Sequence, residues 1–153
     1  MADDTPRKDP LPAFCFKVKI DKIGAELFFK SVGGLKVETE VVDYRAGGVN
    51  HATYKLVGST KWSNIVLKRG FTTAETDLVD WRAKWVKMEP GKLERSGGTI
   101  SQLNTKLEEV ATWTWVDGWP CKFEVSELDA SKNEIVIETL EIAHQGLTFT
   151  KKK

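Results

Sequence analysis

The residue types that could carry out chemistry are few in this chain and lie far apart. Four possible metal ligands or nucleophiles stand singly: Cys15, His51, Cys121 and His144. Zinc sites usually draw their ligands from closely spaced pairs, and neither histidine has a serine or cysteine in a nucleophile-elbow context. We therefore expect no catalytic residue, no metal and no cofactor. A hydrolase using His51 or His144 is kept as a third alternative, for which no substrate suggests itself.

Neighbouring carboxylates and paired glycines offer two further chemistries. Glu108 with Glu109, or Glu138 with Glu141, could form an acid/base pair, although exposed acids are ordinarily solvated. A phosphate-binding loop needs glycines between a strand and a helix N-terminus, which no Gly-Gly pair of this chain has. We expect these glycines at turns or close backbone approaches. The three pairs are Gly33-Gly34, Gly47-Gly48 and Gly97-Gly98.

Composition indicates one globular domain without a dominant charge. The chain has 153 residues, with 23 Lys and Arg against 22 Asp and Glu, so no global field attracts nucleic acid or an anionic membrane. We expect a flexible, proline-rich arm over residues 1–12, a folded domain over 13–150 and a basic tail at 151–153. The N-terminus resembles no signal peptide, so synthesis in a bacterial cytoplasm is expected.

Alternating apolar and polar residues predict a mainly β, antiparallel fold. The sequence favours a sandwich or barrel of two packed sheets with one flanking helix, because strands and helices do not alternate. Turns are expected at Gly97-Gly98 and at Asp117-Gly118, the latter closing a hairpin. The expected strands cover residues 13–20, 26–30, 35–42, 62–69, 99–103, 111–116, 119–127 and 134–144.

One helix is predicted to begin at a capping box, Thr72-Thr73-Ala74-Glu75, and to end at Pro90-Gly91. Apolar residues recur along it at spacings of three and four, which places Leu78, Trp81 and Trp85 on one packed face. Trp119 is expected to pack near that helix. Crowding of Trp113, Trp115 and Trp119 leaves an alternative open, in which a monomeric β-barrel binds a small ligand among the three rings.

The segment after the 35–42 strand is unusual. Residues 43–61 have no sustained period and contain Gly47-Gly48, and a loop of this length in a compact domain usually has a function. Folded back as a two-legged extension, it would reach roughly 25–30 Å at about 3.3 Å per residue. The strand before it carries Lys36, Glu38 and Glu40 on one face, so edge-to-edge pairing between subunits would form a ring with a polar lining.

Several motifs in register over residues 13–149 carry a family resemblance. They are Phe14-x-Phe16-x-Val18, Phe29-x-x-Val32-x-Gly34-Leu35, Glu38-x-Glu40-Val41-x-x-Tyr44-Arg45-x-Gly47-Gly48-x-Asn50, Lys55-Leu56-x-Gly58, Asn64-Ile65-x-Leu67-Lys68-Arg69-Gly70, Trp119-Pro120 and Asn133-Glu134-Ile135-x-Ile137-Glu138-x-Leu140-Glu141-Ile142-Ala143-His144. Together they resemble the inner-tube proteins of contractile phage tails and of related extracellular contractile injection systems. The chain departs from that pattern at Ala46, where the family often has an acid, and in its N-terminal arm.

The resemblance implies a structural, self-assembling protein rather than an enzyme. It implies homo-hexameric rings that stack into a tube inside a sheath, with baseplate or spike proteins, tube-terminating proteins and a luminal cargo of DNA or protein as partners. By the same resemblance, the 43–61 segment corresponds to the inter-ring stacking loop. Expected stacking residues are Tyr44, Arg45, Gly47, Gly48, Asn50 and Tyr54, and expected lumen-facing residues are Lys36, Glu38 and Glu40.

Overall fold

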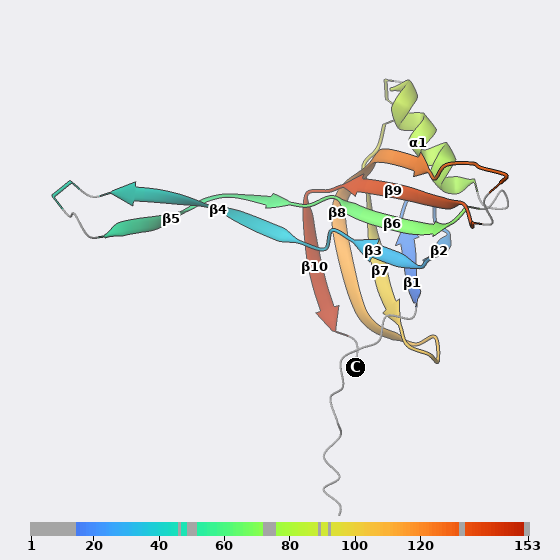
Figure 1. Cartoon of the computed structure of the whole chain (residues 1–153), viewed down its shortest axis with the longest axis horizontal. Helices are drawn as coiled ribbons and strands as arrows, with labels where there is room; N and C mark the ends of the chain where they lie inside the picture. The colour runs from blue at the N-terminus through green and yellow to red at the C-terminus, as the bar shows by residue number, and fades with distance from the viewer. Residues whose placement is uncertain are drawn as a thin grey trace, which may run out of the picture.

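A body of packed strands with one helix carries a long two-stranded arm (Figure 1). The computed structural model describes residues 15–45, 47–48, 52–71, 76–88, 90–91, 93–131 and 134–151. Its elements are β1 (Cys15–Ile20), β2 (Glu26–Phe29), β3 (Ser31–Gly33), β4 (Val37–Arg45), β5 (Thr53–Trp62), β6 (Ile65–Gly70), α1 (Asp77–Lys87), β7 (Ser96–Leu103), β8 (Glu109–Val125), β9 (Ile137–Ala143) and β10 (Gly146–Lys151).

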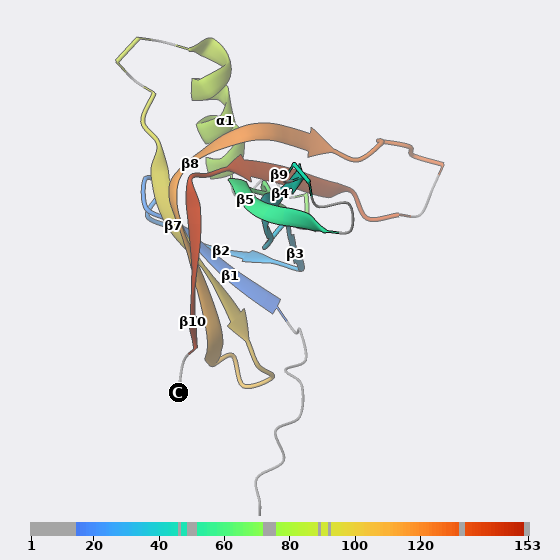
Figure 2. The same cartoon turned by 90° about the vertical axis from the view of Figure 1, so that its left-hand side faces the viewer.

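The body is an antiparallel sandwich, which confirms the expected fold class in its sandwich form. One sheet has the order β2-β1-β7-β8-β10, and the other has the order β8-β9-β6-β3. β8 belongs to both sheets, and Figure 2 shows it bending from one into the other while the β9–β10 corner follows the same bend. The two sheets are thus covalently continuous through β8, and neither closes into a barrel.

The core lies between the sheets and under the helix. Alternate residues of six strands point into it, as the period of two in a strand requires. α1 closes one side with Leu78 and Trp81. The fully buried members include Val18, Ile20, Leu27, Ile65, Leu67, Ile100, Trp115, Leu140 and Ile142. Phe123 and Trp113 pack against this cluster from its margin.

The prediction of a hairpin at Asp117-Gly118 is wrong, because β8 runs through these residues without turning back. Asp117 has a φ of 51°, and the three steps along β8 from Trp115 to Gly118 lie opposite only two steps along β7, from Gly98 to Ser96. A bulge of this kind bends a strand and increases its twist. The Asp117-Gly118 pair therefore bends β8 from one sheet into the other. In the sequence, this pair looks like a hairpin turn because both structures favour a residue with positive φ.

Several expected boundaries are also corrected. Gly97-Gly98 lies inside β7 rather than in a turn, and β3 and β10 were not anticipated as strands. The expected strand over 62–69 begins only at Ile65, and that over 134–144 shortens to β9. The helix begins after its N-cap Thr76 and ends at Lys87, followed by the C-cap Met88, whose φ of 46° is left-handed, so it stops before Pro90. The capping box at 72–75 lies outside the described residues.

The expected loop over 43–61 is largely strand. β4 continues to Arg45 and β5 begins at Thr53, so the two legs form a paired β-ribbon that leaves the body (Figure 1). The alternation of residues 43–61 is obscured because both faces of the ribbon carry apolar and charged residues in different segments. Every described β4 residue is exposed, including Val37, Val41 and Val42.

Candidate assembly surfaces

The arm carries most of the residues expected to act in stacking. Tyr44 and Tyr54 lie directly opposite each other near its tip, and Arg45 lies opposite Thr53. Both tyrosines expose about half of their surface, 54% and 52%. Gly47 and Gly48 form the described part of the tip, where Gly48 has a φ of 90° that favours glycine. Asn50 lies outside the described residues.

A bulge in the middle of the arm shifts the register between its two strands by one residue. Glu40 of β4 faces two residues of β5, Gly58 and Ser59. A Cβ on Gly58 would lie 2.8 Å from the Glu40 carbonyl oxygen, so glycine permits this close approach. The Ser59 hydroxyl donates to the Glu40 carboxylate across 3.3 Å. The side chains of Glu40 and Ser59 therefore contact each other across the bulge.

The three residues expected to face a lumen lie at the base of the arm. The Lys36 ammonium is 3.5 Å from the Glu38 carboxylate, and both side chains are largely exposed. Glu38 lies opposite Lys61 on β5, and Glu40 follows at the bulge. Charges of both signs therefore lie together on this surface, which gives it no strong potential of either sign.

Open strand edges are a second assembly feature of the body. In the described pairing, β2 pairs only with β1, β10 only with β8, and β3 only with β6. An unpaired edge presents backbone N–H and C=O groups that can extend a sheet into another chain. Phe28 of β2 and Phe149 of β10 are more than half exposed beside two of these edges, at 54% and 58%.

The tryptophans divide among separate surroundings. Trp85 of α1 stacks on Trp119 of β8 with ring centroids 5.3 Å apart, and Trp81 lies in the core. Trp115 is fully buried and its Nε1 donates to the Ser96 carbonyl oxygen across 3.0 Å. Trp113 tilts against Phe149 at 5.4 Å. The alternative of a small-ligand binding module requires these three rings to surround one ligand. Trp113, Trp115 and Trp119 instead pack in three different places.

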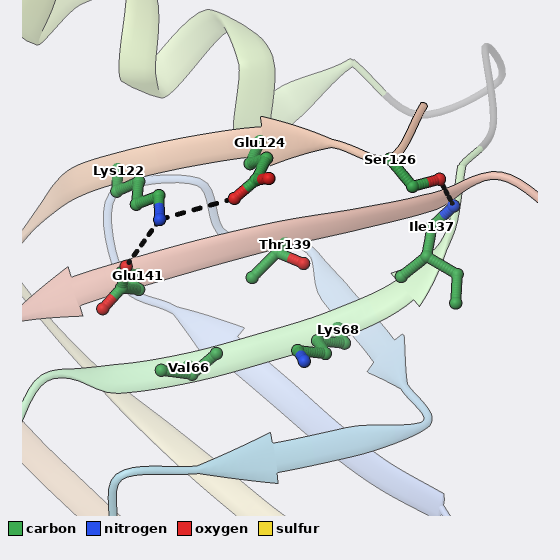
Figure 3. A pocket seen from close by; sticks show the side chains of 8 residues that line it. All are labelled: Val66, Lys68, Lys122, Glu124, Ser126, Ile137, Thr139 and Glu141. Carbon is green, nitrogen blue, oxygen red and sulfur yellow. Dashed lines mark hydrogen bonds and ion pairs between the residues drawn. The ribbon is translucent and has the colours of Figure 1, made fainter. Parts of the chain in front are cut away.

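An open groove of about 470 Å³ lies on the outer face of the β8-β9-β6 sheet (Figure 3). The Lys122 ammonium lies between two carboxylates, 3.4 Å from Glu124 and 3.7 Å from Glu141. Ser126, at its end, accepts a hydrogen bond from the Ile137 backbone at 2.9 Å. Alternation along three strands that are adjacent only in the folded sheet produces this groove, so sequence reasoning did not find it. The groove is charged, shallow and internally neutralised.

The residues considered for chemistry occupy unrelated positions. Glu138 points inward to a buried ion pair with Arg69, whereas Glu141 lines the outer groove, so this carboxylate pair does not converge. Glu109 pairs with Lys17 at 2.7 Å, and Glu108 accepts from Asn104.

The histidines and cysteines are equally scattered. His144 Nε2 lies 2.9 Å from the Ser63 carbonyl oxygen at the foot of the arm, and His51 lies outside the described residues. Partial burial, with a smaller contribution from Glu141, raises the pKa of the Cys121 thiol. Within the ranges that the structure describes, no three His, Cys, Asp or Glu side chains gather as metal ligands. Across those same ranges, α1 is too short and too polar to span a membrane.

A complete core combined with open sheet edges and an exposed apolar arm defines a subunit that associates through its surfaces. Comparison with known proteins identifies the family. Residues 12–148 match the family described as T4-like virus tail tube protein gp19, and the chain therefore belongs to that family of structural tube proteins. A comparison with curated protein sequences gave no match.

Solved structures of contractile particles share the fold. A chain of the extended PVC sheath-tube complex, from an extracellular contractile injection system, is 25% identical with a TM-score of 0.80, covering 95% of this chain and 94% of that one. A chain of the anti-feeding prophage tube terminating cap is 23% identical with a TM-score of 0.82, covering 99% and 97%. Hcp1 from Flavobacterium johnsoniae is 14% identical with a TM-score of 0.55, covering 91% and 97%, which shows a related fold alone.

Proposed function

We propose that this chain is the protomer of the rigid inner tube of a contractile injection machine. Six copies would form a ring, and rings would stack into a tube whose lumen conducts DNA or a protein cargo. The observation that carries this proposal is the exposed β4–β5 arm on a body of otherwise complete packing. At about 3.3 Å per residue, its nine-residue β4 strand reaches about 30 Å, which is long enough to reach a neighbouring ring.

The proposed contacts follow from the position of each residue set. The tip residues Tyr44, Arg45, Gly47, Gly48, Asn50 and Tyr54 would contact the next ring, and Lys36, Glu38 and Glu40 would face the lumen. Open edges at β2 and β10 are suited to joining neighbouring subunits within a ring. Mixed charge at the arm base would neither retain nor repel a polyanionic or folded cargo strongly.

The family and the similar particle structures support the remaining partners by analogy. A sheath would surround the tube, and baseplate or spike and terminating proteins would close its ends. The role is mechanical, so strength would come from summed backbone pairing and side-chain packing between subunits, without catalysis. The assembled form would be part of a phage tail or a related contractile particle.

Assembly of the purified full chain tests the proposal. Negative-stain imaging and light scattering should show rings or tubes, whereas a 17.2 kDa species at all concentrations would refute a self-assembling tube. Replacing Gly47-Gly48 by two valines should leave rings or monomers, because branched residues disfavour the left-handed conformation of Gly48. Long tubes from that variant would contradict the stacking role of the tip. Gly33→Ala is a suitable control, since its added Cβ would meet only Val66 at 3.9 Å.

A further inference from the structure

The two faces of the arm exchange their chemical character halfway along its length. Near the body, one face carries Val37 opposite Trp62 and Val41 opposite Val57, with the Thr39/Thr60 pair between them. The hydroxyls of that threonine pair bond to each other, and the other face carries Glu38 and Lys61. Beyond the Val41/Val57 pair, the order is reversed. The face that was charged now carries Val42, Leu56, Tyr44 and Tyr54, and the face that was apolar now carries Asp43, Lys55, Arg45 and Thr53.

The ribbon also turns over at about the same point. In Figure 1, β4 runs below β5 beside the body and above β5 at the tip, although the two strands remain paired throughout. Two-stranded ribbons twist strongly in the right-handed sense, and a bulge adds to that twist. The Glu40 bulge, made possible by Gly58, lies directly before the change of chemical character.

These two reversals cancel. Where the ribbon turns over, each face comes to point to the opposite side of the arm. At the same place, the apolar residues move from one face to the other. The apolar residues of both segments therefore lie on the same side of the arm. We infer that the arm has one mainly apolar side along its length, interrupted by the Thr39/Thr60 pair, which packs against a second copy of this chain, and one polar side that stays in water. The apolar side consists of Val37, Val41, Val57, Val42, Leu56, Tyr44 and Tyr54.

Exposure and charge support a protein surface as the occupant. Each of these seven side chains exposes between 43% and 88% of its surface, with Val57 the most exposed. An isolated two-stranded ribbon is marginally stable in water, so an apolar side of this length needs a covering layer. The polar side places opposite charges across the strands, as in Asp43 opposite Lys55, and this arrangement suits water.

A second copy is the occupant that the family favours, so this inference rests on the proposed function. It also refines the stacking set. Tyr44 and Tyr54 belong to the packed side, whereas Arg45 lies on the opposite side with Glu38 and Glu40. Val41 and Val57 join the interface although they lie nearer the body than the tip loop.

The experiment introduces the same charge on each side of the arm. Leu56→Glu and Val57→Lys each place a charge on the apolar side of the arm. Leu56 lies beyond the point where the ribbon turns over and Val57 lies at that point, so the two changes test both segments of this side. Thr53→Glu and Ser59→Lys place the same charges on the polar side, where Arg45 and Glu40 lie opposite and can accept them. Circular dichroism and tryptophan fluorescence of all four variants should match the unchanged protein, because all four sites are exposed and lie outside the core.

Assembly measured by light scattering and imaging gives the result. Leu56→Glu and Val57→Lys should each lower the assembled fraction at least about tenfold, since an unpaired charge would be buried at the contact. Thr53→Glu and Ser59→Lys should stay within about twofold. Normal assembly of either apolar-side variant, or equal loss in the controls, overturns the one-sided arm while the tube function stands. An unchanged protein that never assembles overturns both.

Discussion

Gly98 of β7 lies directly against the indole ring of Trp115 of β8, and the ring occupies the space in which a Cβ on Gly98 would stand. The same ring reaches Gly118, where a Cβ would also overlap its Nε1 edge. Trp115 thus lies between two glycines of different strands at the bend of β8. Its position explains why glycine is needed there, inside strands that otherwise disfavour it.

Replacing Gly98 by alanine should therefore destabilise the fold by about 2–3 kcal/mol, because the new methyl group forces the buried ring or the β7 backbone to move. Urea unfolding followed by tryptophan fluorescence measures the change. Gly33→Ala, also in a strand but with an added Cβ in ordinary contact with Val66 at 3.9 Å, should change stability by less than about 0.5 kcal/mol. Equal stability of the Gly98→Ala protein would contradict this account of the bend.

The stacked pair Trp85 and Trp119 should show a coupling free energy of about 1 kcal/mol, since this contact joins α1 to β8. A double-mutant cycle with leucine at each position measures it. The cycle between Trp85 and Trp113 is the matched control, because Trp113 contacts Phe149 instead. That control should give a coupling within about 0.5 kcal/mol of zero, and a similar value for Trp85 with Trp119 would rule out the stacking contribution.

The buried ion pair between Arg69 and Glu138 joins opposite residues of β6 and β9, with Arg69 also 5.3 Å from the Phe29 ring centre. Glu138→Gln should cost about 3–5 kcal/mol, because a buried guanidinium loses its counter-charge. Arg69→Met with Glu138→Leu should cost less than the single change.

The exposed pair between Lys122 and Glu124 lies on the same sheet and provides the comparison. Glu124→Gln should change stability by at most about 1 kcal/mol. If Glu138→Gln were as mild as Glu124→Gln, burial of the Arg69 pair would have no energetic role. Thermal unfolding of all three variants supplies the measurement.

The raised pKa of Cys121, caused first by burial, predicts a pH-dependent reactivity. In a Cys15→Ser background, alkylation of the folded protein at pH 8 should be at least about tenfold slower than in urea, where a free thiol titrates near 8.5. Because the pKa of Cys121 is higher in the folded than in the unfolded protein, the protonated thiol contributes to the free energy of unfolding at pH values below the unfolded pKa. This contribution is lost as the pH rises through the folded pKa. Identical rate profiles in native buffer and in urea, measured by mass spectrometry, would exclude the effect.

Local sequence patterns determined the mainly β class, the single helix and its packed residues Leu78 and Trp81. These follow from alternation and from spacings of three and four, which reflect geometry within one element. The motif resemblance identified the tube family, and the match over residues 12–148 confirms it. The unusual length of residues 43–61 also predicts a projecting segment, but it does not predict that β4 and β5 continue into that segment as strands.

Tertiary structure alone decided how those elements are joined. Asp117-Gly118 has the residues of a hairpin turn, yet the bulge against β7 and pairing with β9 and β10 keep β8 continuous. Likewise, residues 43–61 show no simple period because the twist of the β4–β5 ribbon exchanges its two faces. A linear pattern records which residues alternate, whereas twist and pairing between distant strands determine which side of the molecule they reach.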